Sequence, residues 1–281
     1  MSTATTESAA RPAGGPPAFD RPGFRRLMLA EWTKIRTVRS TLWSLILLVI
    51  LDLGFTALFV GLTAAQWDDM DAGDRASVTA DPTSFILGSG FFLSQLTICV
   101  LGVLVIASEY STGMIRASLL AVPRRLPMLG AKAAVFALVV LVLGVVVSFA
   151  SFFIGAAMIG DKAEVSLGDD GVLRAVVGGG LYLAMLGLFA MAVGAIVRHP
   201  AGGITGVIGF VLVLAPLAML LPGSIGDHVH AYLPSEAGYL IAKAHQGEDD
   251  LLTPWEGFGV FALWTAALLA AAGFLLKRRD A

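Results

Sequence analysis

Charged residues and cysteine are scarce in this chain. Only 14% of its 281 residues are charged, whereas 57% are hydrophobic, which is too much apolar surface for a water-soluble domain to bury. Cys99 is the single cysteine, so an internal disulfide is excluded. No basic motif with interleaved aromatic residues occurs, and we do not expect a nucleic acid as a partner. The composition predicts an integral membrane protein in contact with the lipid bilayer.

Sequence signatures of catalysis are also missing. All four histidines lie outside the long apolar runs and no HExxH motif occurs, which argues against an intramembrane metalloprotease or serine protease. No GxxxxGK[ST] motif occurs either, so the chain is not expected to bind ATP through a P-loop of its own. We therefore predict that the protein is not an enzyme, and that it has no catalytic, metal-binding or cofactor-binding residues.

Long apolar runs dominate the sequence instead. A helix needs about 20 apolar residues to cross the hydrocarbon core of a membrane, and six runs are long enough. They predict an all-α integral membrane protein with six transmembrane helices, in a domain of residues 41–276. The expected spans are residues 41–65, 85–107, 128–159, 172–197, 201–221 and 258–276.

Several local features refine these spans. Only Arg198 to Pro200 separates the fourth span from the fifth, which predicts a tight helical hairpin, and Pro216 is expected to kink the fifth span. The third run is longer than needed, so its start, with Lys132, is expected to project from the bilayer or to reach its surface. Residues 222–257 should form an outer loop with short helices, anchored at the interface by Trp255.

The distribution of basic residues predicts the orientation of the spans. If both termini are cytosolic, only four of the 19 Lys and Arg residues fall in outer segments, while the acidic stretches WDDMDAGD and GEDDLL lie outside. This pattern predicts a multi-pass protein of the cell (plasma) membrane with both termini in the cytosol. Segment 108–125, between the second and third spans, would then face the cytosol. The four outer basic residues are Arg75, Lys162, Arg174 and Lys243.

The segments outside the spans have distinct compositions. Residues 1–23 are rich in Ser, Thr, Ala, Gly and Pro, which predicts a disordered cytosolic tail, and residues 277–281 form a basic cytosolic tail. Residues 24–40 have helical periodicity, with Trp32 on an apolar face and basic residues opposite. This pattern predicts an amphipathic helix in the membrane interface. The helix either serves only as an anchor or also braces a partner protein.

Two acids fall where a charge is unfavourable. Glu31 projects toward the apolar face of the amphipathic helix, where an unpaired carboxylate is strongly destabilising. Either a cation or a backbone amide of another segment, such as the loop after the second span, pairs with Glu31, or the helix is rotated and Glu31 reaches water. Asp52 is the only acid well inside a span. It is either a functional residue facing the bundle interior, or a protonated group that serves helix packing.

Four segments, in order, resemble permease subunits of ABC transporters of the type-2 exporter class, particularly the bacterial six-span members. AEWTKIRTVRSTLW resembles the Glu-x-x-Lys entry helix of that family through Glu31 and Lys34. RHPAGGI resembles its short inner turn, and YLPSEAG resembles a motif of its last outer loop. EYSTGMIRASLLAVPRR with the following LGAK resembles its most recognisable segment through Glu109, Gly113, Arg116, Pro123, Arg124 and Lys132.

The resemblance implies a transport subunit, expected to be an exporter, that forms a translocation path with a second permease copy, identical or different. Separate ABC ATPase subunits would bind the ATP, and segment 108–125 would be a coupling helix seated in the ATPase. The residues implied in coupling are Glu109, Tyr110, Thr112, Gly113, Arg116, Arg124 and Arg125, with Glu31, Trp32 and Lys34 on the interfacial helix. The residues expected along the path are Phe91, Phe92, Gln95 and Pro216, with Asp52 as a further candidate.

Two other classes of function remain open at this point. One is an ion-coupled secondary transporter with Asp52 as the proton carrier, although a single intramembrane acid is a thin basis and no inverted repeat is evident. The other is a membrane scaffold or assembly factor that transports nothing. No motif in the sequence identifies a substrate.

Overall fold

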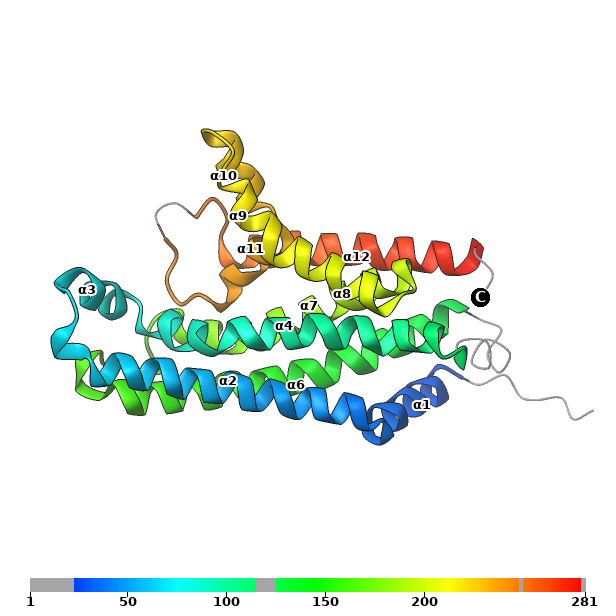
Figure 1. The fold of residues 1–281 in the computed structure, drawn as a ribbon, viewed down its shortest axis with the longest axis horizontal. Helices are drawn as coiled ribbons and strands as arrows, with labels where there is room; N and C mark the ends of the chain where they lie inside the picture. Colours follow the sequence, from blue (N-terminus) through cyan, green and yellow to red (C-terminus); the bar gives the residue numbers. More distant parts are fainter. Residues whose placement is uncertain (1–22, 115–124, 248–249, 279–281) are drawn as a thin grey trace, which may run out of the picture.

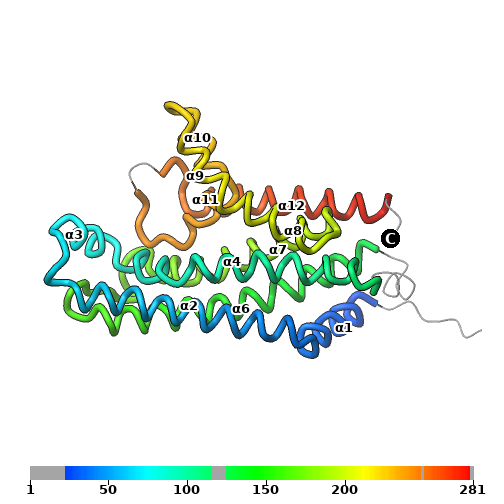
Figure 2. The backbone as a smooth tube through the Cα atoms, viewed as in Figure 1, coloured from blue at the N-terminus to red at the C-terminus, as the bar shows by residue number. Residues whose placement is uncertain are grey.

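A computed structural model describes residues 23–114, 125–247 and 250–278, and this part of the chain is helical without strands. Six of its helical segments are long and apolar enough to cross a membrane, so the chain is an all-α multi-pass membrane protein, as predicted. The long helices lie side by side in an elongated bundle (Figure 1; Figure 2). The spans are Arg39–Ala65 (α2), Pro82–Ser111 (α4), Arg125–Lys162, Val172–Val197 (α7), Pro200–Ala218 and Pro254–Arg278 (α12).

Several of these spans contain more than one element, and shorter helices connect them. The third span consists of α6 (Arg125–Ile159) and the 3-10 turn η2 (Gly160–Lys162), and the fifth of α8 (Pro200–Ile208), the π-helical η3 (Gly209–Val213) and α9 (Leu214–Ala218). The connecting helices are α1 (Phe24–Thr37), η1 (Trp67–Asp69), α3 (Ala72–Ala80), α10 (Ser224–Ala231), α11 (Pro234–Tyr239) and η4 (Leu240–Ala242). The short helices α10 and α11 confirm that residues 222–257 contain short helices, whereas their outer location stays a prediction.

Helices α4 and α7 form the centre of the bundle. They pack along each other, α6 packs on α7, and α2 covers α4 and α6. At Gly102 the backbones of α4 and α7 approach closely, because a Cβ there would lie 2.6 Å from the carbonyl oxygen of Gly187. The outer helices expose apolar side chains such as Trp43 on α2 and Val146 on α6. These exposed side chains suit contact with lipid.

The hairpin between the fourth and fifth spans is as tight as its sequence predicts. Helix α7 ends at Val197, and Arg198 adopts a left-handed backbone conformation with φ 58°. Pro200 begins α8, where its missing N–H leaves no hydrogen bond unmade, and His199 Nδ1 accepts a hydrogen bond of 3.2 Å from the Gly202 amide. Three residues therefore suffice to reverse the chain.

The fifth span is irregular around Pro216, as expected. Proline has no N–H to donate to the carbonyl of Leu212, and its ring crowds that carbonyl, so a regular helix cannot pass through this position. The chain accommodates the proline by the π-helical turn η3 before α9. The helix ends at Ala218, three residues before the expected limit of the span at residue 221.

Different elements lie at the two ends of the bundle. One end, here called the α1 end, carries α1, the end of α4, the start of α6 and the end of α12 (Figure 1). The opposite α3 end carries α3, and the segment with α10 and α11 lies toward it. Val38 is extended and separates α1 from α2, so the amphipathic helix is an element of its own. That the α1 end is cytosolic stays a prediction from the basic residues.

Candidate functional site

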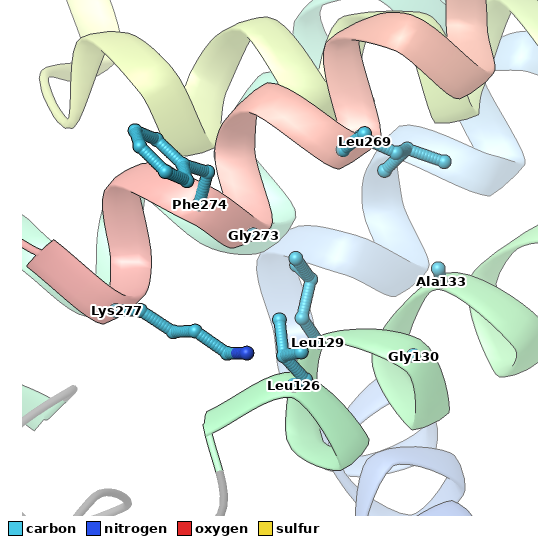
Figure 3. A pocket seen from close by; sticks show the side chains of 9 residues that line it. Leu126, Leu129, Gly130, Ala133, Leu269, Gly273, Phe274 and Lys277 are labelled. Atoms are coloured by element: carbon cyan, nitrogen blue, oxygen red, sulfur yellow. The ribbon is translucent and has the colours of Figure 1, made fainter.

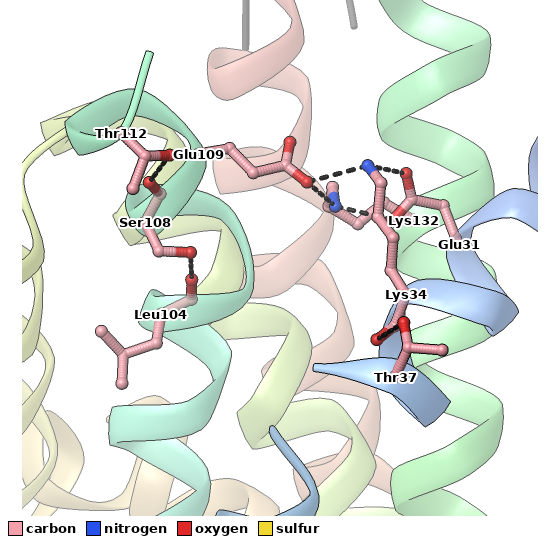
Figure 4. Close-up of polar contacts among 8 residues, drawn as sticks. All are labelled: Glu31, Lys34, Thr37, Leu104, Ser108, Glu109, Thr112 and Lys132. Carbon is pink, nitrogen blue, oxygen red and sulfur yellow. Dashed lines mark hydrogen bonds and ion pairs between the residues drawn. The ribbon is translucent and has the colours of Figure 1, made fainter. Parts of the chain in front are cut away.

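Four charged side chains from three helices meet at the α1 end (Figure 4). Lys132 Nζ, at the beginning of α6, lies 2.7 Å from Glu31 Oε2 on α1 and 2.8 Å from Glu109 Oε1 near the end of α4. Lys34 Nζ on α1 lies 2.9 Å from Glu31 Oε1 and 3.0 Å from Glu109 Oε1. We call these four residues the charge cluster. It connects α1 to α4 and α6, the two helices on either side of the segment of residues 112–124.

The sequence of α1 explains how Glu31 enters the charge cluster. Leu27, Glu31 and Ile35 follow each other at intervals of four residues and are the buried residues of α1, so that Glu31 lies in the middle of the inward face. Lys34, three residues after Glu31, reaches the same carboxylate from the edge of this face. Trp32 lies on another face and is exposed, with the Arg36 guanidinium 5.9 Å from its ring centroid.

The pairing of Glu31 was partly predictable. A cationic partner from another segment is confirmed, and the alternative in which Glu31 reaches water is wrong, because only 7% of the residue is exposed. Among the described residues, the partner from another helix is Lys132 on α6. Lys132 is only 3% exposed, so its side chain does not reach the surface of the protein, whereas the projection of the start of the third span from the bilayer stays a prediction. Two carboxylates hold its ammonium inside the bundle.

The electrostatics of the charge cluster are balanced. Two carboxylates and two ammonium groups sum to no net charge, which is the condition under which buried charges are tolerated. Burial lowers the pKa of Lys34, but its hydrogen bonds to Glu31 and Glu109 and their charges outweigh this effect and raise the pKa above its usual value. Lys34 is therefore fully charged at neutral pH.

Glu109, which the family resemblance places among the residues implied in coupling, is buried. Only 5% of Glu109 is exposed, and its Oε1 accepts hydrogen bonds from both lysines. Its other oxygen, Oε2, is buried and accepts no hydrogen bond from any described residue. The Glu109 side chain thus binds α1 and α6 and retains one acceptor for a further donor.

The other residues expected in coupling lie around the end of α4. Thr112 is exposed and its hydroxyl donates a 2.8 Å hydrogen bond to the Ser108 carbonyl (Figure 4), and Gly113 has a left-handed backbone with φ 72°. Tyr110 is half-buried, with the Arg198 guanidinium 5.0 Å from its ring centroid. Arg116 and Arg124 lie outside the described residues.

Two arginines of the α1 end bind the last turn of α12. Arg125 Nη1 donates a 2.6 Å hydrogen bond to the Leu276 carbonyl, and Arg198 Nη2 donates one of 3.2 Å to the Leu275 carbonyl. The last carbonyls of a helix have no partner within the helix and carry partial negative charge, so cations are favourable there. Arg125, expected to contact an ATPase or α1, is therefore engaged with α12.

A groove of about 490 Å³ separates the start of α6 from the end of α12 (Figure 3). Its lining is apolar, with residues such as Leu129 and Phe274, except for Lys277 at its edge. The groove offers no acid, hydroxyl or amide side chain to a polar solute. Its chemistry suits hydrocarbon.

Asp52 lies in a second buried polar cluster, formed by α2, α4 and α6. Its Oδ2 accepts a 2.5 Å hydrogen bond from Ser94 Oγ, and its Oδ1 accepts one of 2.5 Å from Ser151 Oγ. Gly90 makes this possible, because a Cβ at that position would lie 2.3 Å from the Asp52 carbonyl oxygen and would push α4 away from α2. We call Asp52, Ser94 and Ser151 the hydroxyl cluster. The two serines were not predicted.

Three residues expected along the translocation path lie together. Phe91, Phe92 and Gln95, all on α4, line one cavity of about 260 Å³. Pro216 and Asp52 do not line this cavity. The remaining lining residues were not predicted as path residues, although Glu236 lies in the YLPSEAG segment noted for its family resemblance. These are Gly88 on α4, Tyr182 on α7, and Ser235, Glu236 and Tyr239 on α11.

Neither metal chemistry nor known relatives identify the site. Among residues 23–114, 125–247 and 250–278, no group of three or more His, Cys, Asp or Glu side chains is arranged to hold a metal ion. No protein-family model and no curated protein matches this chain. The assignment of function therefore depends on the chemistry and placement of its own residues.

Proposed function

We propose that this chain is the permease subunit of an ABC transporter of the type-2 exporter class. In this proposal it resides in the plasma membrane, forms the translocation path with a second permease copy, and is driven by separate ATPase subunits that bind ATP. The charge cluster at the α1 end is the single observation that supports this proposal best. It lies between the two helices, α4 and α6, that a soluble partner would move by binding to the segment of residues 112–124.

The placement of the charge cluster gives it a mechanical role. Glu109 lies near the last residue of α4 and Lys132 lies in the first turns of α6, so the two residues are on either side of the segment of residues 112–124. Glu31 and Lys34 bind them both from α1. Separating any of the three helices would leave a charge buried without its partner, which is strongly unfavourable. The three helices α1, α4 and α6 would therefore move as a unit when a partner displaces the segment of residues 112–124.

The movement of this unit would reach the centre of the bundle. Helix α4 packs along α7 and against α8, and α6 packs along α7. A displacement at the α1 end would therefore change the packing of the helices around the cavity lined by Phe91, Phe92 and Gln95. Binding of ATP by the partner would favour one of two arrangements of these helices, because the partner would contact the segment of residues 112–124 differently in each. The buried acceptor Glu109 Oε2 offers a place for an additional donor in one of these arrangements.

The two rival functions have less support. A proton carrier needs access to water from both sides in turn, but Asp52 is buried and both its oxygens accept hydrogen bonds from serines. A scaffold that transports nothing would not require ion pairs that connect its amphipathic helix α1 to both α4 and α6. We therefore favour the ATP-driven transporter.

The proposal is tested by co-purification. The full chain is expressed with the ABC ATPase encoded nearest to its gene, purified through a tag on the chain, and assayed for bound ATPase. We expect wild type and Lys277→Met to retain the ATPase, and Lys132→Met to lose most of it. Of these two lysines, Lys132 alone belongs to the charge cluster that holds α4 and α6 to α1. Lys277 is a matched control, since it is a lysine of the α1 end outside the charge cluster.

Two results would contradict the proposal. One is transport by the purified chain in vesicles with an ion gradient and no ATPase present. The other is an ATPase that never associates with the chain under conditions in which the chain remains folded and monodisperse. The first result would favour a secondary transporter, and the second a scaffold.

A further inference from the structure

We propose that the cavity beside α4 is a binding site for an organic cation that carries an aromatic or aliphatic group. The aromatic cavity is defined by Phe91, Phe92, Gln95, Tyr182, Glu236 and Tyr239. This inference deepens the proposed function, because the bound cation would be the transported solute. The argument uses the rings, the charge and the hydrogen-bonding groups of the cavity in turn.

Three aromatic rings from three different elements meet in one wall of the aromatic cavity. The ring centroids of Phe91 and Tyr182 are 5.3 Å apart, those of Phe91 and Tyr239 are 5.5 Å apart, and those of Tyr182 and Tyr239 are 6.0 Å apart. The faces of aromatic rings carry partial negative charge and attract cations, most strongly where water is excluded. Phe92 also lines the cavity and is 55% exposed. Its ring can cover a bound ligand.

The charge of the aromatic cavity favours a cation. Among the described residues, Glu236 is the only acid in its lining, and the lining contains no Lys, Arg or His. His230 Nε2, outside this lining, lies 3.7 Å from Glu236 Oε2. A bound anion would face the Glu236 carboxylate with no cationic side chain beside it in the described lining. Anionic solutes are therefore excluded by the same group that attracts cations.

A second cavity of about 660 Å³ adjoins the first and shares Glu236 and Tyr239 with it. Among the described residues, its lining adds Asp227 and Asp250, against Lys243 and His230. Lys243 Nζ is already paired with Asp250, at 3.1 and 3.3 Å from its two carboxylate oxygens. Asp227 therefore adds a further carboxylate next to the aromatic cavity.

Hydrogen-bonding groups in the aromatic cavity remain available to a ligand. The Tyr182 hydroxyl donates a 2.6 Å hydrogen bond to Gln95 Oε1, which fixes the orientation of that amide. The Tyr239 hydroxyl makes no hydrogen bond to any described residue, and it lies over Gly88, where a Cβ would come within 3.2 Å of it. A side chain at residue 88 would restrict this space. The cavity thus combines ring faces, one carboxylate and a hydroxyl without a partner.

Binding of two matched probes tests the proposal. Benzyltrimethylammonium is compared with neopentylbenzene, which has the same shape with carbon in place of the charged nitrogen. Binding to the purified full chain in lipid nanodiscs is measured by ligand-observed NMR, without ATP or an ATPase. We expect the cation to bind at least about tenfold more tightly than the neutral probe, which corresponds to one charge-assisted contact.

Variants locate the binding site of the cation. Glu236→Gln, which retains size and hydrogen bonding, should reduce the affinity for the cation about tenfold and leave that for the neutral probe unchanged. Tyr239→Leu should reduce cation affinity about fivefold by removing one ring face, whereas Tyr239→Phe should retain most of it. Asp227→Asn is the matched control, because Asp227 lines only the second cavity.

Equal affinity for the two probes would overturn the proposal, as would a loss in Asp227→Asn as large as that in Glu236→Gln. Thermal melting of each variant in detergent verifies that the variant is folded, and the Tyr239→Phe variant keeps the test valid if Tyr239→Leu is unstable. Because the assay needs no ATPase, its failure refutes the cation site alone. Cation binding by a chain that never associates with an ATPase would instead refute the transporter class while the site stands.

Discussion

The charge cluster and the hydroxyl cluster place acids in the same bundle under different conditions. Glu31 and Glu109 lie at the α1 end, where two lysines neutralise them. Asp52 lies inside the span α2, where its two oxygens bind only serine hydroxyls. Each cluster joins three helices, and α4 and α6 belong to both. The two clusters therefore hold α4 and α6 together at two positions along the bundle, one through ion pairs and the other through hydrogen bonds from serine hydroxyls.

The difference shows how depth in the membrane limits the choice of partner. Long lysine side chains at the α1 end can reach across helices and keep their stems in apolar surroundings, so ion pairs form there. Near the middle of a span, where Asp52 lies, a lysine partner would add a second unfavourable charge, whereas a serine adds none. A neutral, protonated Asp52 would make the hydroxyl cluster free of charge altogether. The charge cluster should consequently be sensitive to neutralisation of a single residue, and the hydroxyl cluster should not.

The largest effect is expected for Lys132→Met. This change leaves Glu31 and Glu109 buried with only Lys34 to compensate both, and loss of one member of a buried ion pair typically lowers stability by about 3–5 kcal/mol. Equilibrium unfolding of the purified protein in detergent measures the loss. Lys277→Met, at the edge of the groove between α6 and α12, should change stability by less than about 0.5 kcal/mol. Similar losses in the two variants would show that the charge cluster is not distinctive.

A second neutralisation should restore part of this loss. In Glu109→Gln/Lys132→Met, one positive and one negative charge are removed together, and the Glu31–Lys34 pair at 2.9 Å remains. The double variant should therefore be more stable than Lys132→Met alone, with a coupling of about 1–3 kcal/mol between the two positions. A double-mutant cycle from the same unfolding measurements gives this value. Additive losses would contradict the ion-pair account.

An intermediate effect is expected for Gly90→Ala. The new Cβ would lie 2.3 Å from the Asp52 carbonyl oxygen and 2.5 Å from Thr56 Oγ1, so α2 and α4 must separate and weaken the Ser94–Asp52 hydrogen bond. Such overpacking typically lowers stability by about 1–3 kcal/mol. Gly54→Ala on α2 is the matched control, because no atom lies within 4 Å of its added Cβ. A larger loss in the control would refute the proposed helix contact.

The smallest effect is expected for Asp52→Asn. The amide has nearly the same shape as a carboxylic acid and can still hydrogen-bond to both serines, so stability should fall by less than about 1 kcal/mol. Unfolding and the co-purification assay should both resemble wild type. A loss of transport with intact folding would instead assign Asp52 to proton coupling and favour the secondary transporter.

The sequence predicted the fold well because each span is a local pattern. The expected limits of the spans agree with the helices within four residues, since an apolar run and its flanking polar or proline residues determine where a helix begins and ends. The turn at Arg198 to Pro200 and the irregularity before Pro216 were predictable for the same reason. The boundary between the amphipathic helix and the first span was expected after residue 40, and the structure places it at Val38, since a local pattern locates a helix end only to within about two residues.

The site was less predictable, because its contacts connect distant parts of the chain. Lys132 and Glu31 are 101 residues apart, and Ser151 and Asp52 are 99 residues apart. Periodicity placed Glu31 on the apolar face of α1 and left open whether it pairs with another segment or reaches water, because the outcome depends on how α6 packs on α1. Glu109 was named only as a residue implied in coupling, and its contacts with Lys34 and Lys132 depend on how three helices pack. Likewise, no local pattern connects Tyr182 with Glu236 and Tyr239 in the aromatic cavity.

Site-directed crosslinking tests most directly that an ATPase drives this chain from the α1 end. Cys99 is buried and unreactive, so Thr112→Cys and Ser77→Cys each place one exposed thiol, at the α1 end and on α3 at the opposite end. We predict that a thiol-reactive photocrosslinker traps the ATPase subunit from residue 112 and not from residue 77. Crosslinking from residue 77, or from neither residue in a complex that contains the ATPase, would contradict the account.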